Sequence, residues 1–225
     1  MIDYFQAVTK KKFNLKRISG LVLWLDALQE NFSDDDTVGT WTDRSGQGND
    51  AIQTTEVNKP VYKTNILNGR PILRFDGSNS FLDLTSALDI SEGAIFIVAR
   101  NNDGTNGSCP LSKKSSSNGQ IWMSPTQVGI QPNTGIYYGG SIGTTAFHIV
   151  GCKSDGSNWN VFADRTDGTP ASDSSNIQPD CIGRYNSGGV YDMDGDIAEI
   201  IVLNVEPSSD EIDQIYSYLE NKWNI

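Results

Sequence analysis

The sequence predicts an all-β protein: a two-sheet antiparallel jelly-roll sandwich with one C-terminal α-helix. Three observations predict it. The 225 residues include 22 glycines and 8 prolines with many Ser, Asn, Asp and Thr, which is typical of short strands joined by tight turns. Apolar runs of strand length recur between turn-rich stretches. At the C-terminus the apolar residues change to a helical spacing.

The predicted strands are short runs rich in β-branched and aromatic residues. The continuous apolar runs Leu21–Leu25 and Ala94–Ala99 are typical of strands buried on both faces. Further strands are expected at 72–75, 81–82, 121–123, 136–138, 147–152, 159–162 and 196–203. Because sandwiches of about 200–250 residues commonly form one unit, we expect residues 20–225 to be a single domain.

The C-terminal segment predicts the helix. Its apolar residues recur at i, i+3, i+4, i+7 and i+11, on one helical face: Ile212, Ile215, Tyr216, Leu219 and Trp223. Ser208 and Glu211 have the spacing of a capping box, which starts a helix after Ser208. We expect the apolar face of this helix to cover the sandwich.

The formal net charge of −11 limits the partners. An acidic surface repels phosphate backbones, so nucleic acid is not an expected partner. No apolar run approaches the roughly 20 residues of a membrane-spanning helix, so no membrane span is expected. The N-terminus lacks the apolar centre of a secretory signal, which favours a protein used without that export route.

Residues 1–19 differ in charge from the rest of the chain. Five cations stand against the single acid Asp3, a formal charge of +4 that leaves −15 for the remainder: Lys10, Lys11, Lys12, Lys16 and Arg17. One interpretation is a solvated terminus. The other is a basic assembly arm that docks on an acidic neighbour, such as the body of a second copy in a homo-oligomer.

The three cysteines, Cys109, Cys152 and Cys181, are widely spaced and odd in number. No Cys-x-x-Cys pair is present, so a zinc site of the cysteine type is not predicted. We expect small apolar residues in or near strands. One disulfide plus a free thiol is the alternative.

Four segments, in this order, resemble the LamG-like jelly-roll domains of the concanavalin A-like lectin/glucanase superfamily. They are Leu-Trp-Leu-Asp-Ala at 23–27, Trp-Thr-Asp-Arg-Ser-Gly-Gln-Gly-Asn-Asp-Ala at 41–51, Arg-Phe-Asp-Gly at 74–77, and 195–204 with the ending Tyr-Leu-Glu-Asn-Lys-Trp-Asn-Ile at 218–225. The resemblance covers about residues 20–225 and leaves the basic arm outside.

This resemblance implies the predicted sandwich, binding of glycans or proteins and, in some members, calcium. The look-alikes that share the Tyr-Leu-x-x-Lys-Trp ending are often virion proteins of bacteriophages or pieces of bacterial surface proteins. It therefore implies a place on a phage virion surface, with the bacterial cell surface or secretion as alternatives. A fold alone does not fix an activity.

An acidic cluster precedes the last predicted strand. Asp192, Asp194 and Asp196 would share one strand face, and Glu199 would point to the other face if the strand is regular. Glycoside hydrolysis uses such paired carboxylates, but the related glycanases have Glu at positions that are Asp here, and Gly195 indicates a turn or bulge. A solvated acidic turn is one alternative, and a Ca²⁺ site with Asp194 and Asp196 as ligands is another.

The loop 43–49 also has two interpretations. Asp43 and Ser45 can accept hydrogen bonds from backbone amides, and Gly46 and Gly48 permit a tight turn. Asp43 and Asn49 are alternatively ligands of a calcium ion. Calcium is the one cofactor that the sequence brings into consideration.

Nucleophilic catalysis has little support. His148, the single histidine, alternates with apolar neighbours in a predicted strand, where a hydrogen-bonded structural role is expected. Neither a Gly-x-Ser-x-Gly elbow nor a phosphate-binding glycine loop occurs. The sequence therefore predicts a protein that is not an enzyme.

Glycan binding needs exposed aromatic rings, and six are available outside the predicted core: Trp122, Tyr137, Tyr138, Trp159, Tyr185 and Tyr191. Tyr185 and Tyr191 flank a glycine-containing loop, a common place for a binding rim. One ring of the pair Tyr137-Tyr138 must face outward in a strand. We select Tyr185, Tyr191, Tyr138 and Trp159 as candidate ligand-binding residues.

The sequence therefore predicts a non-catalytic virion or surface structural protein that recognises glycans or neighbouring proteins, such as a decoration, fibre or tail adhesin. One alternative is an assembly protein without a glycan ligand, held by its basic arm. The other is a glycoside hydrolase that uses the 192–199 carboxylates.

Overall fold

The computed structural model describes residues 13–225 except 103–106, 117, 134, 144 and 187–190. Within these residues the chain forms two antiparallel sheets of nine and eight strands and one α-helix, α1 (Ser209–Trp223). This confirms the predicted all-β sandwich with a C-terminal helix. No helix among the described residues is long and apolar enough to cross a membrane.

The larger sheet has the order β14-β13-β12-β7-β17-β5-β4, with β1 paired to β17 and β15 paired to β13. Its strands are β1 (Leu21–Asp26), β4 (Val61–Leu67), β5 (Arg70–Asp76), β7 (Glu92–Asn101), β12 (His148–Asp155), β13 (Asn158–Ala163), β14 (Thr166–Asp167), β15 (Ala171–Ser172) and β17 (Asp194–Leu203).

The smaller sheet has the order β11-β10-β9-β8-β16-β6-β3-β2. Its strands are β2 (Thr40–Trp41), β3 (Ala51–Ile52), β6 (Leu82–Leu84), β8 (Ser108–Ser112), β9 (Gln120–Met123), β10 (Gln127–Gln131), β11 (Tyr137–Ser141) and β16 (Cys181–Ile182). Three short 3₁₀ helices occur among the described connections: η1 (Leu15–Arg17), η2 (Ala27–Gln29) and η3 (Glu56–Asn58).

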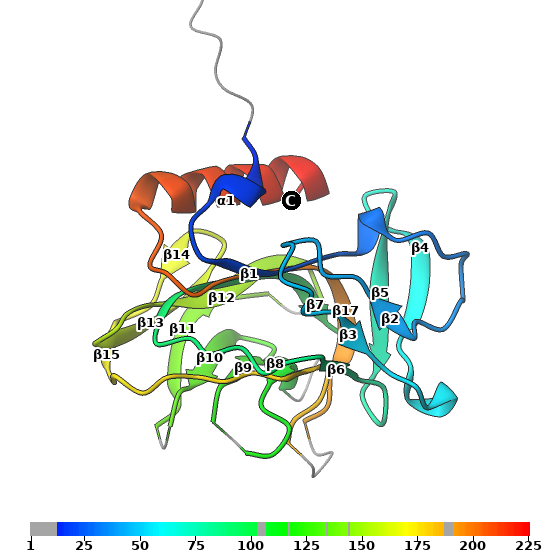
Figure 1. The fold of residues 1–225 in the computed structure, drawn as a ribbon, viewed down its shortest axis with the longest axis horizontal. Coiled ribbons are helices and arrows are strands. Elements are labelled where there is room, and N and C mark those ends of the chain that lie inside the picture. Colours follow the sequence, from blue (N-terminus) through cyan, green and yellow to red (C-terminus); the bar gives the residue numbers. More distant parts are fainter. Residues whose placement is uncertain (1–12, 103–106, 117, 134, 144, 187–190) are drawn as a thin grey trace, which may run out of the picture.

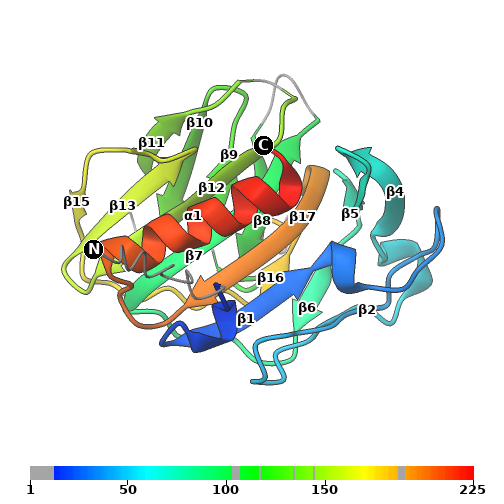
Figure 2. The ribbon, with the colours of Figure 1, turned by 90° about the horizontal axis from the view of Figure 1, so that it is seen from above.

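The sandwich has two apolar cores stacked on one another. The first lies between the sheets, where side chains such as Leu25, Ile97 and Ile121 are fully buried. The second lies between the larger sheet and α1, where Phe96 of β7 packs against Tyr216 of the helix. Figures 1 and 2 show α1 lying across the larger sheet, on the side away from the smaller sheet. One outer face of the sandwich is therefore covered by the chain itself.

Helix α1 forms for the reasons that its sequence indicates. Ser208 accepts a hydrogen bond from the Glu211 backbone and Glu211 bonds back to the Ser208 backbone, which completes the predicted capping box. Four of the five predicted apolar positions are buried against the larger sheet: Ile215, Tyr216, Leu219 and Trp223. Asn224 ends the helix in the left-handed conformation.

A bulge in β17 changes one prediction. The register against β7 shifts between Ile197 and Glu199, with Ala198 as the extra residue. As a result Glu199 points to the same face as Asp196, the face covered by α1, and not to the opposite face as a regular strand would place it.

The three cysteines are free and buried, as expected for small apolar residues in strands. Burial raises the pKa of all three thiols well above the ordinary value.

Candidate functional site

The outer face of the smaller sheet carries the candidate site. Trp122 of β9 lies between Ile121 and Met123, which are both fully buried in the inter-sheet core, so its side chain points outward. Trp122 pairs with Gly129 on β10, and Gly129 pairs with Tyr138 on β11. Residues paired across adjacent strands share a face, so these three form one row on the outer side of the sheet.

The Tyr138 ring lies across Gly129. A Cβ atom at position 129 would come 2.8 Å from a ring carbon of Tyr138, so only glycine fits beneath the ring. Tyr138 is 51% exposed, which confirms that one residue of the Tyr137-Tyr138 pair faces out. Tyr137 instead packs against the inter-sheet core.

Trp122, Tyr185 and Tyr191 form a three-ring cluster, hereafter the aromatic cluster. Their ring centroids lie 5.0 Å (Trp122 to Tyr185), 4.8 Å (Trp122 to Tyr191) and 5.3 Å (Tyr185 to Tyr191) apart. The planes are steeply tilted, an arrangement that aromatic pairs favour. Tyr191 remains 38% exposed. The structure thus brings two predicted ligand-binding residues together on a third aromatic residue.

Hydrogen bonds fix both ends of the loop that carries these tyrosines. The backbone N–H of Tyr185 donates to Asp192 Oδ1 at 3.0 Å, and the N–H of Cys109 donates to the Tyr191 carbonyl at 3.1 Å. Burial raises the pKa of Asp192, although the Tyr185 N–H and the nearby Arg184 oppose this shift. The two ring-bearing residues are therefore held on the body of the sheet.

A pair of cations lies over the ring of Phe81. The guanidinium carbon of Arg184 lies 4.6 Å from the Phe81 ring centroid, and the Lys114 ammonium lies 4.9 Å from the same centroid. Lys114 also pairs with Asp83 at 2.7 Å. Arg184 directly precedes Tyr185, so the cation pair and the aromatic cluster are joined along the chain.

The other selected aromatic residue, Trp159, requires a correction. Its side chain is fully buried in the inter-sheet core, and its indole N–H donates to the Ser175 carbonyl at 3.0 Å. It has no surface to offer to a glycan. Its neighbours in β13, Asn158 and Asn160, are less buried, so the alternation of the strand places Trp159 inward, toward the other sheet.

The Asp43 carboxylate, a predicted calcium ligand, is occupied by hydrogen bonds from its own loop and from β1. The Asp43 carboxylate accepts from the backbone N–H groups of Trp24, Ser45 and Asn49 and from the Ser45 hydroxyl, at 2.7–3.0 Å. The Asn49 side-chain amide donates to the Val22 carbonyl at 2.9 Å. Asp43 therefore organises this turn, as the structural interpretation predicts.

Asp194 and Asp196 are not assembled into a metal site either. Asp196 is fully buried and accepts from Arg74 and Arg100 at 2.6–3.0 Å, so two cations occupy its oxygens. Asp194 lies two residues earlier on β17, where its backbone N–H bonds to Ser108. Within the described parts of the chain, no three His, Cys, Asp or Glu side chains gather in a way that could hold a metal ion.

The carboxylates considered for glycoside hydrolysis face different surroundings. Glu199 is fully buried beneath α1, where it accepts from Trp24, Tyr218, Lys222 and Trp223 at 2.6–2.8 Å. Asp192, in contrast, lies beside the aromatic cluster. The acidic residues of 192–199 therefore do not line one open cleft.

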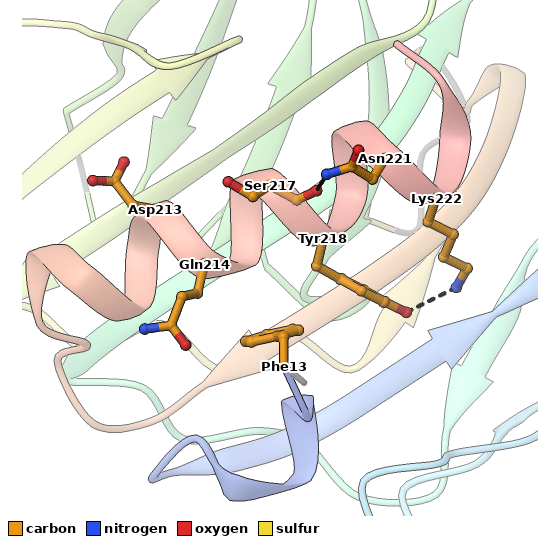
Figure 3. Close-up of a pocket in the computed structure, with 7 residues that line it drawn as sticks. All are labelled: Phe13, Asp213, Gln214, Ser217, Tyr218, Asn221 and Lys222. Atoms are coloured by element: carbon orange, nitrogen blue, oxygen red, sulfur yellow. Dashed lines mark hydrogen bonds between the residues drawn. The ribbon is translucent and has the colours of Figure 1, made fainter. Parts of the chain in front are cut away.

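A groove on the opposite side of the molecule is the other candidate. It has a volume of ≈ 580 Å³ and lies between Phe13 and the exposed side of α1, as Figure 3 shows. The Lys222 ammonium bonds to Tyr218, Glu199 and Asp26, so its charge is directed into the protein and not toward a ligand.

The basic arm is described only in part. Lys10, Lys11 and Lys12 lie outside the described residues. Lys16 and Arg17 lie on η1, beside Leu15, which is 3% exposed and belongs to the core under α1. The ring of Phe13 also packs on Tyr218 of α1 at 5.4 Å. Residues 13–19 are thus packed on the sandwich, although they lie outside the resembling region.

Sequence reasoning passed over three residues of the site. Trp122 was one of six available rings, and its buried neighbours Ile121 and Met123 were the signal that it faces outward. Arg184 and Lys114 had no such signal, because their position on Phe81 depends on contacts between distant segments.

Comparison with known proteins shows the fold. No protein-family model and no curated protein matches this chain. Domain 4 of AbnA, a GH43 extracellular arabinanase from Geobacillus stearothermophilus in complex with arabinotriose, aligns with a TM-score of 0.61 and 12% identity, over 88% of this chain and 98% of that chain.

Two further structures share the sandwich. Trypanosoma rangeli sialidase in complex with sialic acid has a TM-score of 0.57 and 16% identity over 90% of this chain, which spans 33% of the sialidase chain. The binding domain of Botulinum neurotoxin serotype D has a TM-score of 0.59 and 10% identity, over 88% of this chain and 51% of that chain. The neighbours thus include both glycosidases and binding domains, and at these identities they establish the β-sandwich fold alone.

Proposed function

We propose that this protein is a non-catalytic glycan-recognition module, and that the outer face of its smaller sheet is the binding surface. The carrying observation is the aromatic cluster, in which Tyr191 remains 38% exposed, together with the cation Arg184 that directly precedes Tyr185 of the cluster. Aromatic rings stack on the apolar faces of sugars, and nearby charged groups bond their hydroxyls. The fold shared with an arabinanase domain seen with arabinotriose supports this proposal.

The absence of catalysis is part of the proposal. A glycosidase needs two carboxyl groups that face the same sugar. Asp196 is neutralised by two arginines, and Glu199 is covered by α1. Neither side chain can reach a substrate on the outer face of the smaller sheet.

The first experiment is binding of the purified protein to a broad glycan array, followed by titration of the strongest ligand. We expect the double variant Trp122→Ala/Tyr191→Ala to weaken binding about tenfold or more, because it removes two stacking surfaces. Phe13→Ala, which removes a ring from the α1 groove, is the matched control and should bind normally.

Two outcomes would overturn this proposal: no saturable binding to any glycan, or loss of binding in Phe13→Ala with retention in the double variant. The same titration with excess chelator tests the calcium prediction. If binding is unchanged in chelator, calcium is not needed for it, and the proposed glycan-binding function is retained without calcium.

A second role in assembly is favoured by the two described arm cations. Lys16 and Arg17 make no ion pair within the described chain, although the protein has a net charge of −11. We propose that the arm contacts an acidic surface of a neighbouring protein, such as another copy of this chain. The virion surface, or alternatively a bacterial surface, is the proposed location.

The assembly role is tested by a variant that lacks residues 1–12 and also carries Lys16→Gln and Arg17→Gln, two exposed positions. A deletion of 1–19 would also remove Leu15 from the core under α1 and would confuse assembly with stability. Sedimentation of the full chain and the truncated chain should show loss of self-association, or of incorporation into particles, with glycan binding retained. Equal association of both chains would exclude the arm.

A further inference from the structure

The charge of Arg184 is not used inside the protein. Most lysines and arginines of the described sandwich form ion pairs, such as Arg74 with Asp196 and Lys114 with Asp83. Arg184 makes no ion pair and donates no side-chain hydrogen bond within the described part of the chain. In a protein with a net charge of −11, an arginine without a carboxylate partner at the candidate site is a distinctive feature.

The position of Arg184 is nevertheless fixed. Its carbonyl accepts a hydrogen bond from the Ser112 hydroxyl, and the next residue, Tyr185, donates its N–H to Asp192. The guanidinium group lies over the Phe81 ring at 4.6 Å, which holds one side of the group against the sheet. A guanidinium that is already oriented loses less conformational entropy when it binds a ligand.

The part of Arg184 that a ligand can reach is the end of the side chain. The Nε atom is buried and has no acceptor within the described residues, so the terminal amino groups are the donors available to a ligand. These groups form a planar fork that matches the two oxygens of a carboxylate or sulfate group.

The two nearby acids, Asp83 and Asp192, do not pair with the Arg184 guanidinium. Asp83 is paired with Lys114 at 2.7 Å, on the same Phe81 ring. Asp192 is 5% exposed, and its Oδ1 accepts from the Tyr185 backbone at 3.0 Å. Asp192 lies close enough to influence Arg184 but is not within ion-pair distance of it.

We infer that the ligand of this face is an anionic glycan, whose carboxylate or sulfate group binds the Arg184 guanidinium while a neighbouring sugar ring contacts the aromatic cluster. This inference rests on the proposed glycan-binding function. It adds the chemical class of the ligand and a specificity-determining residue. Arg184 and Tyr185 are adjacent in the chain, so one short oligosaccharide can contact both parts.

The test compares three sets of oligosaccharides of equal length by isothermal titration: carboxylated (oligogalacturonides), sulfated, and neutral (arabino-oligosaccharides). We expect the protein to bind at least one anionic set tighter than the neutral set. Arg184→Gln should reduce that binding about ten- to hundredfold and leave weak neutral binding unchanged, because only the charge-assisted bonds are lost. Arg184→Lys should recover part of the affinity, since it restores charge without the planar fork.

Arg17→Gln is the matched control, because it removes the same charge from η1 on the far side of the larger sheet. The melting temperature of each variant shows that it is folded. Tighter binding of neutral glycans, or equal losses in Arg17→Gln and Arg184→Gln, would overturn the inference and leave the glycan-binding function standing. Absence of binding to all three sets, together with a negative array, would instead overturn the proposed function.

Discussion

The two outer faces of the sandwich are completed in different ways. On the larger sheet, α1 covers the face, and the charged groups beneath or beside it are paired within the chain, as Glu199 is with Lys222 and Asp196 with two arginines. On the smaller sheet, Tyr138 and Tyr191 stay exposed and Arg184 has no ion-pair partner within the described residues. Burying a charge without a partner is costly, so the charged groups on a covered face need partners within the chain. An open face can keep its groups for a ligand.

Removal of the Glu199 carboxylate is expected to give the largest effect. In Glu199→Ala, four donors, one of them the Lys222 ammonium, lose their shared acceptor under α1, so the free energy of unfolding should fall by about 3–5 kcal/mol. Urea unfolding measures this loss. Glu206→Gln, at an exposed position, is the control. A loss below about 1 kcal/mol would mean that the covered face does not depend on this cluster.

Asp196→Asn is the second test of the same face. Arg74 and Arg100 are 36% and 25% exposed at their side chains, so water can partly solvate them when the carboxylate is lost. We expect a smaller destabilisation, about 2 kcal/mol, by urea unfolding. The variant also tests hydrolysis, because cleavage of polysaccharide by the native protein that disappeared in Asp196→Asn would show that this carboxylate is catalytic.

Tyr191→Ala tests the open face. Its ring is 38% exposed and packs on the rings of Trp122 and Tyr185, so the free energy of unfolding should fall by at most about 1 kcal/mol. Glycan affinity measured on the same sample should fall clearly. A large loss of stability with unchanged binding would reverse the comparison and make the cluster structural.

His148 should give the smallest effect, and one that depends on pH. Its Nδ1 lies 2.5 Å from an Asp164 carboxylate oxygen, and this bond raises the His148 pKa above its ordinary value of about 6.5. A raised pKa stabilises the fold at pH values below the unfolded pKa, and this contribution is lost as pH rises through the folded pKa. His148→Gln should therefore lose under about 1 kcal/mol at pH 5.5, because Asp164 is half exposed, and less at pH 8.5. A larger loss at the higher pH would contradict the assignment.

Local pattern decides those elements whose signal lies within a few residues. The capping box of Ser208 and Glu211 and the apolar stripe of α1 fix that helix, and continuous apolar runs fix β1 and β7. The sequence also predicted that Asp43 holds its turn together by accepting hydrogen bonds, because most of the donors belong to the same short loop.

The binding site and the buried charges needed the tertiary structure. Trp122 lies between apolar neighbours and Trp159 between two asparagines, so strand alternation accounts for one ring facing out and the other in. Which rings meet Trp122 depends instead on the position of the 185–191 segment in the fold. The bulge at Ala198 places Glu199 on the face opposite to the one that a regular strand would give it, and no local sequence pattern predicts this bulge.

By itself, the sequence determined the sandwich, its closing helix and the acidic net charge, because periodicity, capping and net charge are local or additive properties. The tertiary structure alone decided which aromatic rings form the cluster and that Arg184 has no ion-pair partner within the described residues. Arg184 meets Phe81 across about 100 residues of chain, and whether a charge finds a partner depends on every segment that folds beside it.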